Sequence, residues 1–347
     1  ELTGVYGLSA LIVLLNVAVT EGVVAAVYRG AWRPAARHVI GVAVLVGVAW
    51  CFGAVRLAQL SSQPPQRSWR IAAIQANIPS LVKHDTTKDD EILRRHVILT
   101  MRAVRACRPD AVIWPETAIP GYLAERRLSF VVITNLMAAI RIPLLTGLPS
   151  YRDEFQPYFR RYFNCAGVIE PNGELGPTYA KKHLVMFGEY VPFERYLPFL
   201  SLVTPMEGSY TPGTHTTILV VSNGHAATLV GPLICFEDAF GYLARAMARA
   251  GAQVLVNFTN DGWFRNSPEA YQHASLAGFR AIETRRPLVR VTNAGVTIVV
   301  DRCGRETAVL ERDGRRTGVS GYLFDVVGIH PPITTVYMRC GNWLLLA

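Results

Sequence analysis

The sequence predicts an α/β sandwich preceded by two membrane-spanning helices, and three observations support this fold class. Residues 1–60 are almost continuously apolar in two runs, each about as long as a bilayer is thick. From Trp69 onward, short β-branched runs alternate with helical patterns, which is typical of sheets covered by helices. Finally, 50% of the residues are hydrophobic and only 18% are charged, a composition that indicates lipid contact for part of the chain.

The two apolar runs extend from Leu8 to Tyr28 and from Val39 to Leu60. A hairpin of soluble helices is the alternative, but such helices usually have a polar face and these runs have almost none. The basic segment RGAWRPAARH separates them, and short basic loops stay on the cytoplasmic side. We therefore expect everything after residue 60 to be exported. Because no initiator Met or basic leader precedes the first run, we also expect more protein before residue 1.

A polar, proline-containing linker at 61–68 (SSQPPQRS) leads into the predicted catalytic domain at 69–330. Its expected strands are 70–78, 110–116, 143–150, 164–170, 216–222, 227–235, 253–260, 287–293 and 295–301, and its expected helices are 86–107, 122–140, 239–250 and 268–284. After the pair Pro331-Pro332, residues 331–347 read as the start of a possible C-terminal transmembrane helix that is truncated.

Composition argues against several classes of site. The six cysteines lie singly, with no C-x-x-C pair and no histidine at zinc spacing, so neither a metal site nor a disulfide framework is expected. The formal net charge of +9 would draw the domain toward anionic headgroups, whereas no spacing resembles a nucleic-acid module. We expect no cofactor and no nucleic-acid partner.

Three segments each put a reactive side chain at a strand exit, the usual place for catalytic groups in α/β folds. In VIWPETAIP, an apolar strand runs through Trp114-Pro115 into Glu116, which would be partly desolvated and suited to a general base. In YAKKHLVMFGEYVPF, a lysine lies in an apolar and aromatic stretch with Glu189 or Glu116 as carboxylate partner. The pattern alone does not decide whether Lys181 or Lys182 points inward.

The third segment is ATLVGPLICFEDAFGYLARAMARAG, in which a long apolar strand delivers Cys235 to a turn before a helix. A thiol at a helix N-terminus beside a lysine is expected to favour the thiolate, the nucleophilic form. Each segment has a plain structural interpretation on its own: a capping glutamate, a solvated lysine pair, a buried cysteine. Together they supply base, electrophile and nucleophile for acyl transfer.

The order Glu116, Lys181, Cys235 resembles the Glu-Lys-Cys triad of the nitrilase (carbon-nitrogen hydrolase) superfamily. More closely, the blocks WPETAIP, KKHLVMFGEYVPF, GPLICFEDAF, NFTNDGWF and RRPLVRVTNAGVT look like those of the bacterial apolipoprotein N-acyltransferases, and the resemblance covers essentially the whole chain. It implies a nitrilase-like α-β-β-α sandwich on the periplasmic side of a multi-pass protein of the bacterial inner (cytoplasmic) membrane.

The resemblance also implies a reaction and its partners. An acyl chain passes from a phospholipid donor to Cys235 as a thioester, and then to the α-amino group of the N-terminal diacylglyceryl-cysteine of an apolipoprotein acceptor. By analogy, Glu116 is the general base, Lys181 stabilises the oxyanion and was selected by the family's Y-x-K-x-H spacing, and His183 follows it. Further family residues are expected to support this triad or to shape the pocket. The supporting positions are Glu189, Phe236, through its backbone amide, and Glu237, and the pocket positions are His84, Asn260, Asp261 and Trp263.

Two positions depart from the family pattern: His84 stands where tryptophan is common, and Met186 where proline is common. Both belong to loops expected to flank the lipid path. Two other functions fit part of the pattern. One is a membrane-tethered nitrilase-type amidase acting on a small amide, and the other is a non-catalytic membrane scaffold, which an intact triad disfavours.

Overall fold

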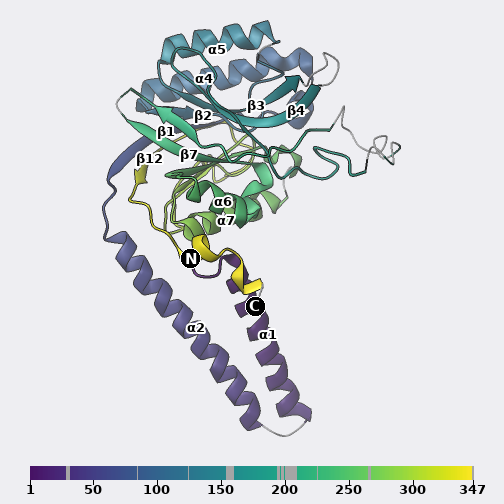
Figure 1. The fold of residues 1–347 in the computed structure, drawn as a ribbon, viewed down its shortest axis with the longest axis vertical. Coiled ribbons are helices and arrows are strands. Elements are labelled where there is room, and N and C mark those ends of the chain that lie inside the picture. Colours follow the sequence, from purple (N-terminus) through teal and green to yellow (C-terminus); the bar gives the residue numbers. More distant parts are fainter. Residues whose placement is uncertain are drawn as a thin grey trace.

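The computed structural model describes residues 1–347 except 29–31, 84, 124, 154–159, 194–195, 197–198, 200–208, 225, 265–266 and 346–347. Two long helices, α1 (Val5–Tyr28) and α2 (Trp32–Ser61), precede the α/β part of the chain. Both are long and apolar enough to cross a membrane, and most of their described side chains are exposed. Figure 1 shows them leaving one side of the domain, with the end of α1 and the start of α2 farthest from it.

The α/β part contains two six-stranded sheets. The first has the strand order β12-β1-β2-β3-β4-β5. Its strands are β1 (Arg67–Gln75), β2 (Ala111–Ile113), β3 (Leu144–Asp153), β4 (Arg160–Ile169), β5 (Tyr179–Ala180) and β12 (Gly321–Ile329). β1, β2 and β3 are parallel, so their carboxyl ends open at the same edge, and β12 pairs antiparallel with β1 from Arg67↔Ile329 to Gln75↔Gly321.

The second sheet has the order β11-β10-β9-β8-β7-β6. Its strands are β6 (Leu219–Ser222), β7 (Ala227–Ile234), β8 (Val254–Thr259), β9 (Leu288–Thr292), β10 (Ile298–Val300) and β11 (Glu306–Val309). β7, β8 and β9 are parallel. Their carboxyl ends therefore also meet at one edge, where Cys235, Asn260 and Asn293 follow.

Helices cover the outer faces of both sheets, which gives the α-β-β-α sandwich that the sequence predicted. In Figure 1, α4 and α5 lie above the first sheet, and α6 and α7 lie below the second. The helices are α3 (Ser80–Lys83), α4 (Asp89–Cys107), α5 (Arg127–Ile140), α6 (Gly241–Arg249), α7 (Glu269–Thr284) and α8 (Val336–Cys340), with short 3-10 turns η1 (Thr86–Lys88), η3 (Cys235–Ala239), η4 (Asp261–Phe264) and η5 (Trp343–Leu345).

Two hydrophobic cores hold these layers together. The larger joins the facing sides of the two sheets to α6 and α7, and it contains Ile71 of β1, Leu233 of β7 and Val289 of β9. The smaller lies between the first sheet and α4 and α5. Burial of these apolar side chains is the main driving force for the fold, and it leaves the strand exits as the places where polar groups gather.

The expected elements are present, but some are shorter than expected. The helix expected at 122–140 begins at Arg127, and the strand expected at 110–116 ends at Ile113. The helix expected at 86–107 begins at Asp89, because Thr86–Lys88 forms a 3-10 turn in which the Asp85 side chain accepts from the Thr87 amide. β5, β11 and β12 were not expected. β12 closes the first sheet by bringing the end of the domain back to β1, a pairing between residues about 250 positions apart that no local pattern records.

The segment after β12 packs against the start of α1. The Tyr337 amide of α8 donates to the Glu1 carbonyl at 3.0 Å, and Trp343 Nε1 donates to the Leu2 carbonyl at 3.1 Å. At the first turn of α1, the Val5 amide donates to the Glu283 carboxylate of α7 at 2.8 Å. Within the described part of residues 331–347 the chain forms α8 and η5, so a further membrane helix there stays a prediction.

Candidate active site

Glu116 lies two residues beyond the Trp114 that follows β2, at the edge where the parallel strands of the first sheet end. Trp114 is fully buried and its Nε1 donates to Thr100 Oγ1 of α4 at 2.8 Å, which anchors the strand exit. The chain then passes against Gly147 of β3. A Cβ on Gly147 would lie 2.6 Å from the Glu116 Cα, so this close approach requires glycine. The Glu116 side chain is consequently held in place and only 7% of the residue is exposed.

Lys181 follows β5 and is fully buried between two carboxylates. Its Nζ lies 2.8 Å from Glu189 Oε2 and 3.6 Å from Glu116 Oε1. Asn164 of β4 joins the two acids, because its Nδ2 donates at 2.8 Å both to Glu116 Oε1 and to Glu189 Oε1. Glu189 is therefore the closer carboxylate partner of the lysine, a choice that the sequence had left open.

Lys182 points away from this cluster. Its Nζ donates to Thr216 Oγ1 at 2.8 Å near the surface. For Lys181, burial by itself lowers the pKa of the ammonium group, but the negative charges of Glu116 and Glu189 outweigh burial and raise that pKa well above its ordinary value. Lys181 is thus a permanent cation at neutral pH, able to stabilise a negative charge beside it.

Cys235 begins η3 directly after β7, in the second sheet. It has a positive φ of 52°, a left-handed conformation that costs energy for a residue with a side chain. Its carbonyl is held by the Asn257 side chain of β8, whose Nδ2 donates to it at 2.9 Å. Lys181 and Glu116 lie close enough for their charges to shift the pKa of the thiol. The two sheets therefore bring the three expected side chains within electrostatic range of one another.

The protonation of the thiol differs from the expectation. Burial is the largest influence and raises the pKa of Cys235 far above its ordinary value; the Glu116 carboxylate adds to this, and Lys181 only partly opposes it. The expected help from a helix N-terminus is also weak, because α6 begins at Gly241 and Cys235 starts a single 3-10 turn. The expectation of a favoured thiolate is therefore wrong, and the resting thiol needs a base.

The two glutamates of the cluster differ in how their oxygens are used. Glu189 Oε1 accepts from Asn164, while Glu189 Oε2 accepts from Lys181 and from the Val185 amide at 2.9 Å. Glu116 uses only Oε1, and its Oε2 has no hydrogen-bond donor among the described residues. Glu116 therefore keeps one oxygen that is available to accept a proton, whereas Glu189 does not.

Glu237, two residues after the cysteine, is completely buried and ties η3 to the lysine strand. Its carboxylate accepts from the amides of Ile234 and Lys182 at 2.8 and 2.7 Å, from the His183 amide at 3.1 Å, and from the Tyr179 hydroxyl. These contacts fix η3, the turn that begins with Cys235, relative to Lys181. Loss of a carboxylate with this many buried donors would leave several of them unsatisfied.

A buried network of charged side chains contacts η3 through Asp238. Arg290 of β9 donates to Asp238 Oδ2 at 2.6 Å, to Asn257 Oδ1 at 2.8 Å and to Asp261 Oδ2 at 2.9 Å. His273 of α7 bridges the same two aspartates, through Nε2 to Asp238 at 2.8 Å and Nδ1 to Asp261 at 3.1 Å. Burial and Arg290 lower the pKa of His273, but both aspartates outweigh them and raise it to about 9.

The remaining expected residues take different places. His183 is half-buried, with its ring 3.7 Å from that of Phe240 between centroids, and Phe236 is 40% exposed. As an early residue of η3, Phe236 has no intrahelical acceptor for its backbone amide. Asn260 accepts from Asn293 Nδ2 at 3.0 Å. Asp261, expected to shape the pocket or to give structural support, is 2% exposed and belongs to the charged network.

His84 and the side chain of Trp263 lie outside the described part of the structure.

Three residues that the sequence analysis did not select also contribute to the candidate active site. Asn164 bridges the two glutamates, Arg290 holds the turn through Asn257, and Lys83 donates from Nζ to the Glu116 carbonyl at 2.8 Å. Burial lowers the pKa of Lys83 to about 8, against the opposing charge of Glu116. A lysine inside the apolar NIPSLVK segment was a signal that could have been followed.

The cluster combines a protonated thiol, an acid with a free oxygen and a buried ammonium group. This set suits nucleophilic attack on a carbonyl carbon through a covalent thioester, with the ammonium facing the oxyanion. Among the described residues, no group of three or more His, Cys, Asp or Glu side chains is arranged to hold a metal ion.

Comparison with known proteins gives two kinds of match. The carbon-nitrogen hydrolase family model matches residues 70–323. Among curated proteins, the chain is 36% identical over 309 residues to the apolipoprotein N-acyltransferase of Geobacter metallireducens, covering 88% of this chain and 57% of that protein. It is 30% identical over 312 residues to the apolipoprotein N-acyltransferase of Allorhizobium ampelinum, covering 87% and 57%. The chain thus spans a little over half the length of these relatives.

Solved structures share the fold at low sequence identity. Saccharomyces cerevisiae Nit3, a member of branch 10 of the nitrilase superfamily, matches with a TM-score of 0.55 at 19% identity, over 77% of this chain and 92% of that chain. An amidase from Nesterenkonia sp. matches with a TM-score of 0.55 at 19% identity, over 82% and 96%. At this identity the likeness concerns the fold alone.

Proposed function

Because the chain belongs to the carbon-nitrogen hydrolase family, we propose that it is the catalytic part of a membrane-bound N-acyltransferase. In this proposal it moves an acyl chain from a phospholipid to the α-amino group of the N-terminal diacylglyceryl-cysteine of an apolipoprotein. The observation that carries the proposal is the cluster of Cys235, Lys181 and Glu116 in a domain attached to two exposed apolar helices. The names of the curated relatives support the same activity.

The first half of the reaction loads the enzyme. The free Oε2 of Glu116 takes the proton of the Cys235 thiol, and the sulfur attacks the ester carbonyl carbon of the phospholipid. The carbonyl electron pair moves onto oxygen, where the Lys181 ammonium and the Phe236 amide stabilise the negative charge. As the intermediate collapses, the ester C–O bond breaks and the leaving alkoxide takes the proton from Glu116. The products are a lysophospholipid and a Cys235 thioester.

The second half of the reaction transfers the acyl group. The neutral α-amine of the acceptor attacks the thioester carbon, and Glu116 takes a proton from the amine. The C–S bond then breaks, the amide forms, and the proton on Glu116 returns to the sulfur of Cys235. Glu189 and Asn164 keep Lys181 and Glu116 in place through both halves, because Glu189 pairs with Lys181 and Asn164 donates to both glutamates.

Lipid contact is supported by side chains beside the cluster as well as by the helices. Val185, Met186 and Phe187 lie between Lys181 and Glu189 in sequence, and all three are exposed large apolar residues. Exposed apolar groups at the entrance of a site suit an acyl chain. The helix hairpin also supports a periplasmic domain, since α1 and α2 both reach the domain and the start of α2, with Arg33 and Arg37, lies at the opposite end.

The direct test is to incubate the chain with a phospholipid that carries a labelled acyl chain and to measure the intact protein mass. We expect one acyl mass on Cys235, released by hydroxylamine as a thioester. Cys235→Ala is expected to show no adduct, and the matched variant Cys303→Ala, at another partly buried cysteine, is expected to label fully.

The competing activity is that of a tethered amidase. It predicts hydrolysis of a small amide by wild-type protein and no acyl adduct from phospholipid. That combination of results would refute the acyltransferase proposal while leaving Cys235 as the nucleophile.

A further inference from the structure

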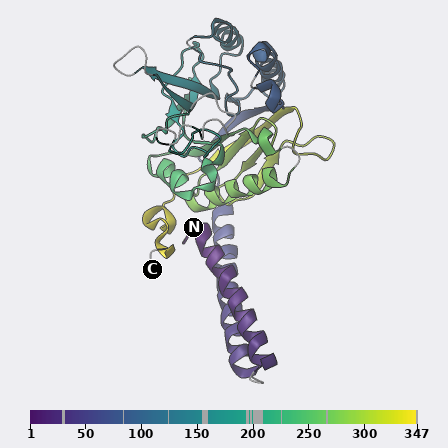
Figure 2. The same cartoon turned by 90° about the vertical axis from the view of Figure 1, so that its right-hand side faces the viewer.

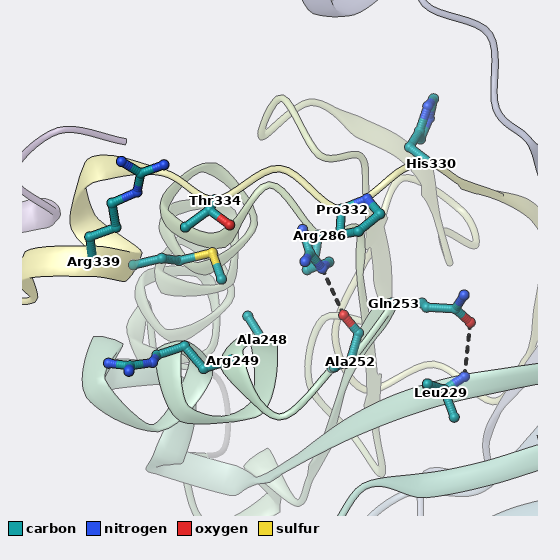
Figure 3. A pocket seen from close by; sticks show the side chains of 12 residues that line it. Leu229, Ala248, Arg249, Ala252, Gln253, Arg286, His330, Pro332, Thr334 and Arg339 are labelled. Carbon is teal, nitrogen blue, oxygen red and sulfur yellow. Dashed lines mark hydrogen bonds between the residues drawn. The ribbon is translucent and has the colours of Figure 1, made fainter.

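A hollow of about 460 Å³ lies far from the triad, at the opposite end of the second sheet. Its walls come from the start of β7, the end of α6 and the segment that runs from β12 into α8 (Figure 3). Leu229 of β7 lines it, whereas Cys235 follows the other end of that strand. Six residues of β-strand separate the two by roughly 20 Å. The hollow is therefore no part of the acyl-transfer site.

Three arginines from separate elements line this hollow: Arg249 at the end of α6, Arg286 before β9 and Arg339 in α8. Figure 3 shows Arg249 and Arg339 toward one end of it, with Arg286 nearer the middle. No aspartate or glutamate is among the lining residues. Arg249 and Arg339 are both exposed, and neither forms an ion pair with any described residue.

Arg286 is a buried cation without a counter-ion. It is 5% exposed, and its guanidinium donates only to backbone carbonyls, at 2.7 Å to Ala252 and at 3.1 to 3.3 Å to Thr284, Arg285 and Ile333. Its Nη2 group donates to none of the described residues. Burial lowers the pKa of Arg286, which reflects the cost of an unpaired charge in this place. Buried charges in proteins are normally paired, so a negative group at this position would be strongly stabilised.

The hollow also lies where α1 and α2 meet the domain. α8, which carries Arg339, binds the start of α1 through the Tyr337 amide and the Glu1 carbonyl. His330, on the other wall, lies beside the backbone of Pro64, three residues beyond the end of α2. If α1 and α2 cross a bilayer, the hollow faces its headgroup layer. The planar guanidinium group of arginine carries paired N–H donors and a positive charge, and both match the oxygens of a phosphate group.

We propose that this hollow binds the phosphate group of an anionic phospholipid headgroup, as a second lipid site separate from the acyl-transfer site. Arg286 and the pair Arg249 and Arg339 are its ligands. A lipid held there would fix the domain on the membrane at the base of both helices. That the bound phosphate belongs to a lipid rests on the membrane location proposed above, whereas recognition of the phosphate itself rests on the arginines alone.

The test uses the full chain carrying Cys235→Ala, so that no lipid is consumed, purified in detergent and titrated with phosphatidylglycerol or with phosphatidylcholine. Native mass spectrometry then counts the lipids retained. We expect tighter retention of phosphatidylglycerol, and a loss of about 10-fold or more in its apparent affinity in the double variant Arg249→Gln/Arg339→Gln. The matched double variant Arg102→Gln/Arg105→Gln removes two exposed charges from α4, on the far side of the molecule, and should retain the lipid as before.

Equal retention by the two double variants, or equal retention of both lipids, would overturn the proposal. A second arm adds inorganic phosphate at millimolar concentration and measures the unfolding temperature. Phosphate could raise the unfolding temperature in a way that depends on Arg249 and Arg339, while those arginines have no effect on retention of phosphatidylglycerol. That result would show that the hollow binds soluble phosphate and would overturn the proposal that it binds a lipid. Arginine-dependent lipid retention without an acyl adduct in wild-type protein would refute the proposed function and leave this inference intact.

Discussion

Replacing Glu116 by glutamine should lower turnover while making the nucleophile easier to alkylate. Glutamine keeps an oxygen to accept from Asn164 Nδ2 but loses the free carboxylate oxygen that takes the thiol proton in the proposed reaction. A positioned general base contributes about 10²- to 10⁴-fold, which is about 3–5 kcal/mol of activation free energy. The Glu116 charge also raises the pKa of Cys235, so its removal lowers that pKa and increases the fraction of thiolate.

Two assays on the same preparation measure these opposite effects. Transfer of a labelled acyl chain to an acceptor peptide gives the turnover, and the rate of iodoacetamide modification of Cys235 at pH 8, read by mass spectrometry, gives the thiolate fraction. Glu189→Gln is the matched control, because it removes a charge from the same cluster without removing a free oxygen. It should lower the unfolding temperature more, since it breaks the 2.8 Å pair with the buried Lys181.

The reasoning fails if Glu116→Gln turns over within about threefold of the wild-type rate, because a general base cannot be worth so little. It also fails if the thiol of the variant is alkylated more slowly than that of the wild type. In that case the carboxylate favours the thiolate, and the direction assigned to the Cys235 pKa is wrong.

Two further predictions concern groups around the cluster. The fold raises the pKa of His273 from 6.5 to about 9. The stability that the charged imidazole of His273 contributes to the fold is therefore fully present below pH 6.5 and is lost as the pH rises to about 9. The difference in unfolding free energy between wild type and His273→Gln, measured by chemical denaturation, should therefore shrink by on the order of 3 kcal/mol across that window; a constant difference would contradict a charged His273. Lys83→Met removes the donor to the Glu116 carbonyl, so turnover should fall about 10-fold through kcat, and the inflection near pH 8 that Lys83 gives to the pH profile should disappear. The exposed Lys88→Met serves as its control, and an unchanged profile in Lys83→Met would exclude a role for that ammonium group.

Much of the fold could be predicted because it is recorded locally. Strands such as 227–234 and helices such as 269–284 follow from apolar runs and periodicity that a short window contains. β12 escaped notice because its identity as an edge strand depends on β1, far away in sequence. The same limit applied to Asn164 and Arg290, whose importance lies in partners contributed by other strands.

The amino-acid sequence by itself determined the α/β sandwich, the two apolar helices and the strand exits at which Glu116, Lys181 and Cys235 stand. Periodicity, hydropathy and turn residues are properties of neighbouring positions, and they are present before the chain folds. The tertiary structure alone decided which lysine faces inward, which glutamate keeps a free oxygen, that burial raises the pKa of the Cys235 thiol, and that three arginines share one hollow. Each of these depends on distances between remote residues and on exclusion of water, and both arise only when the two sheets pack together.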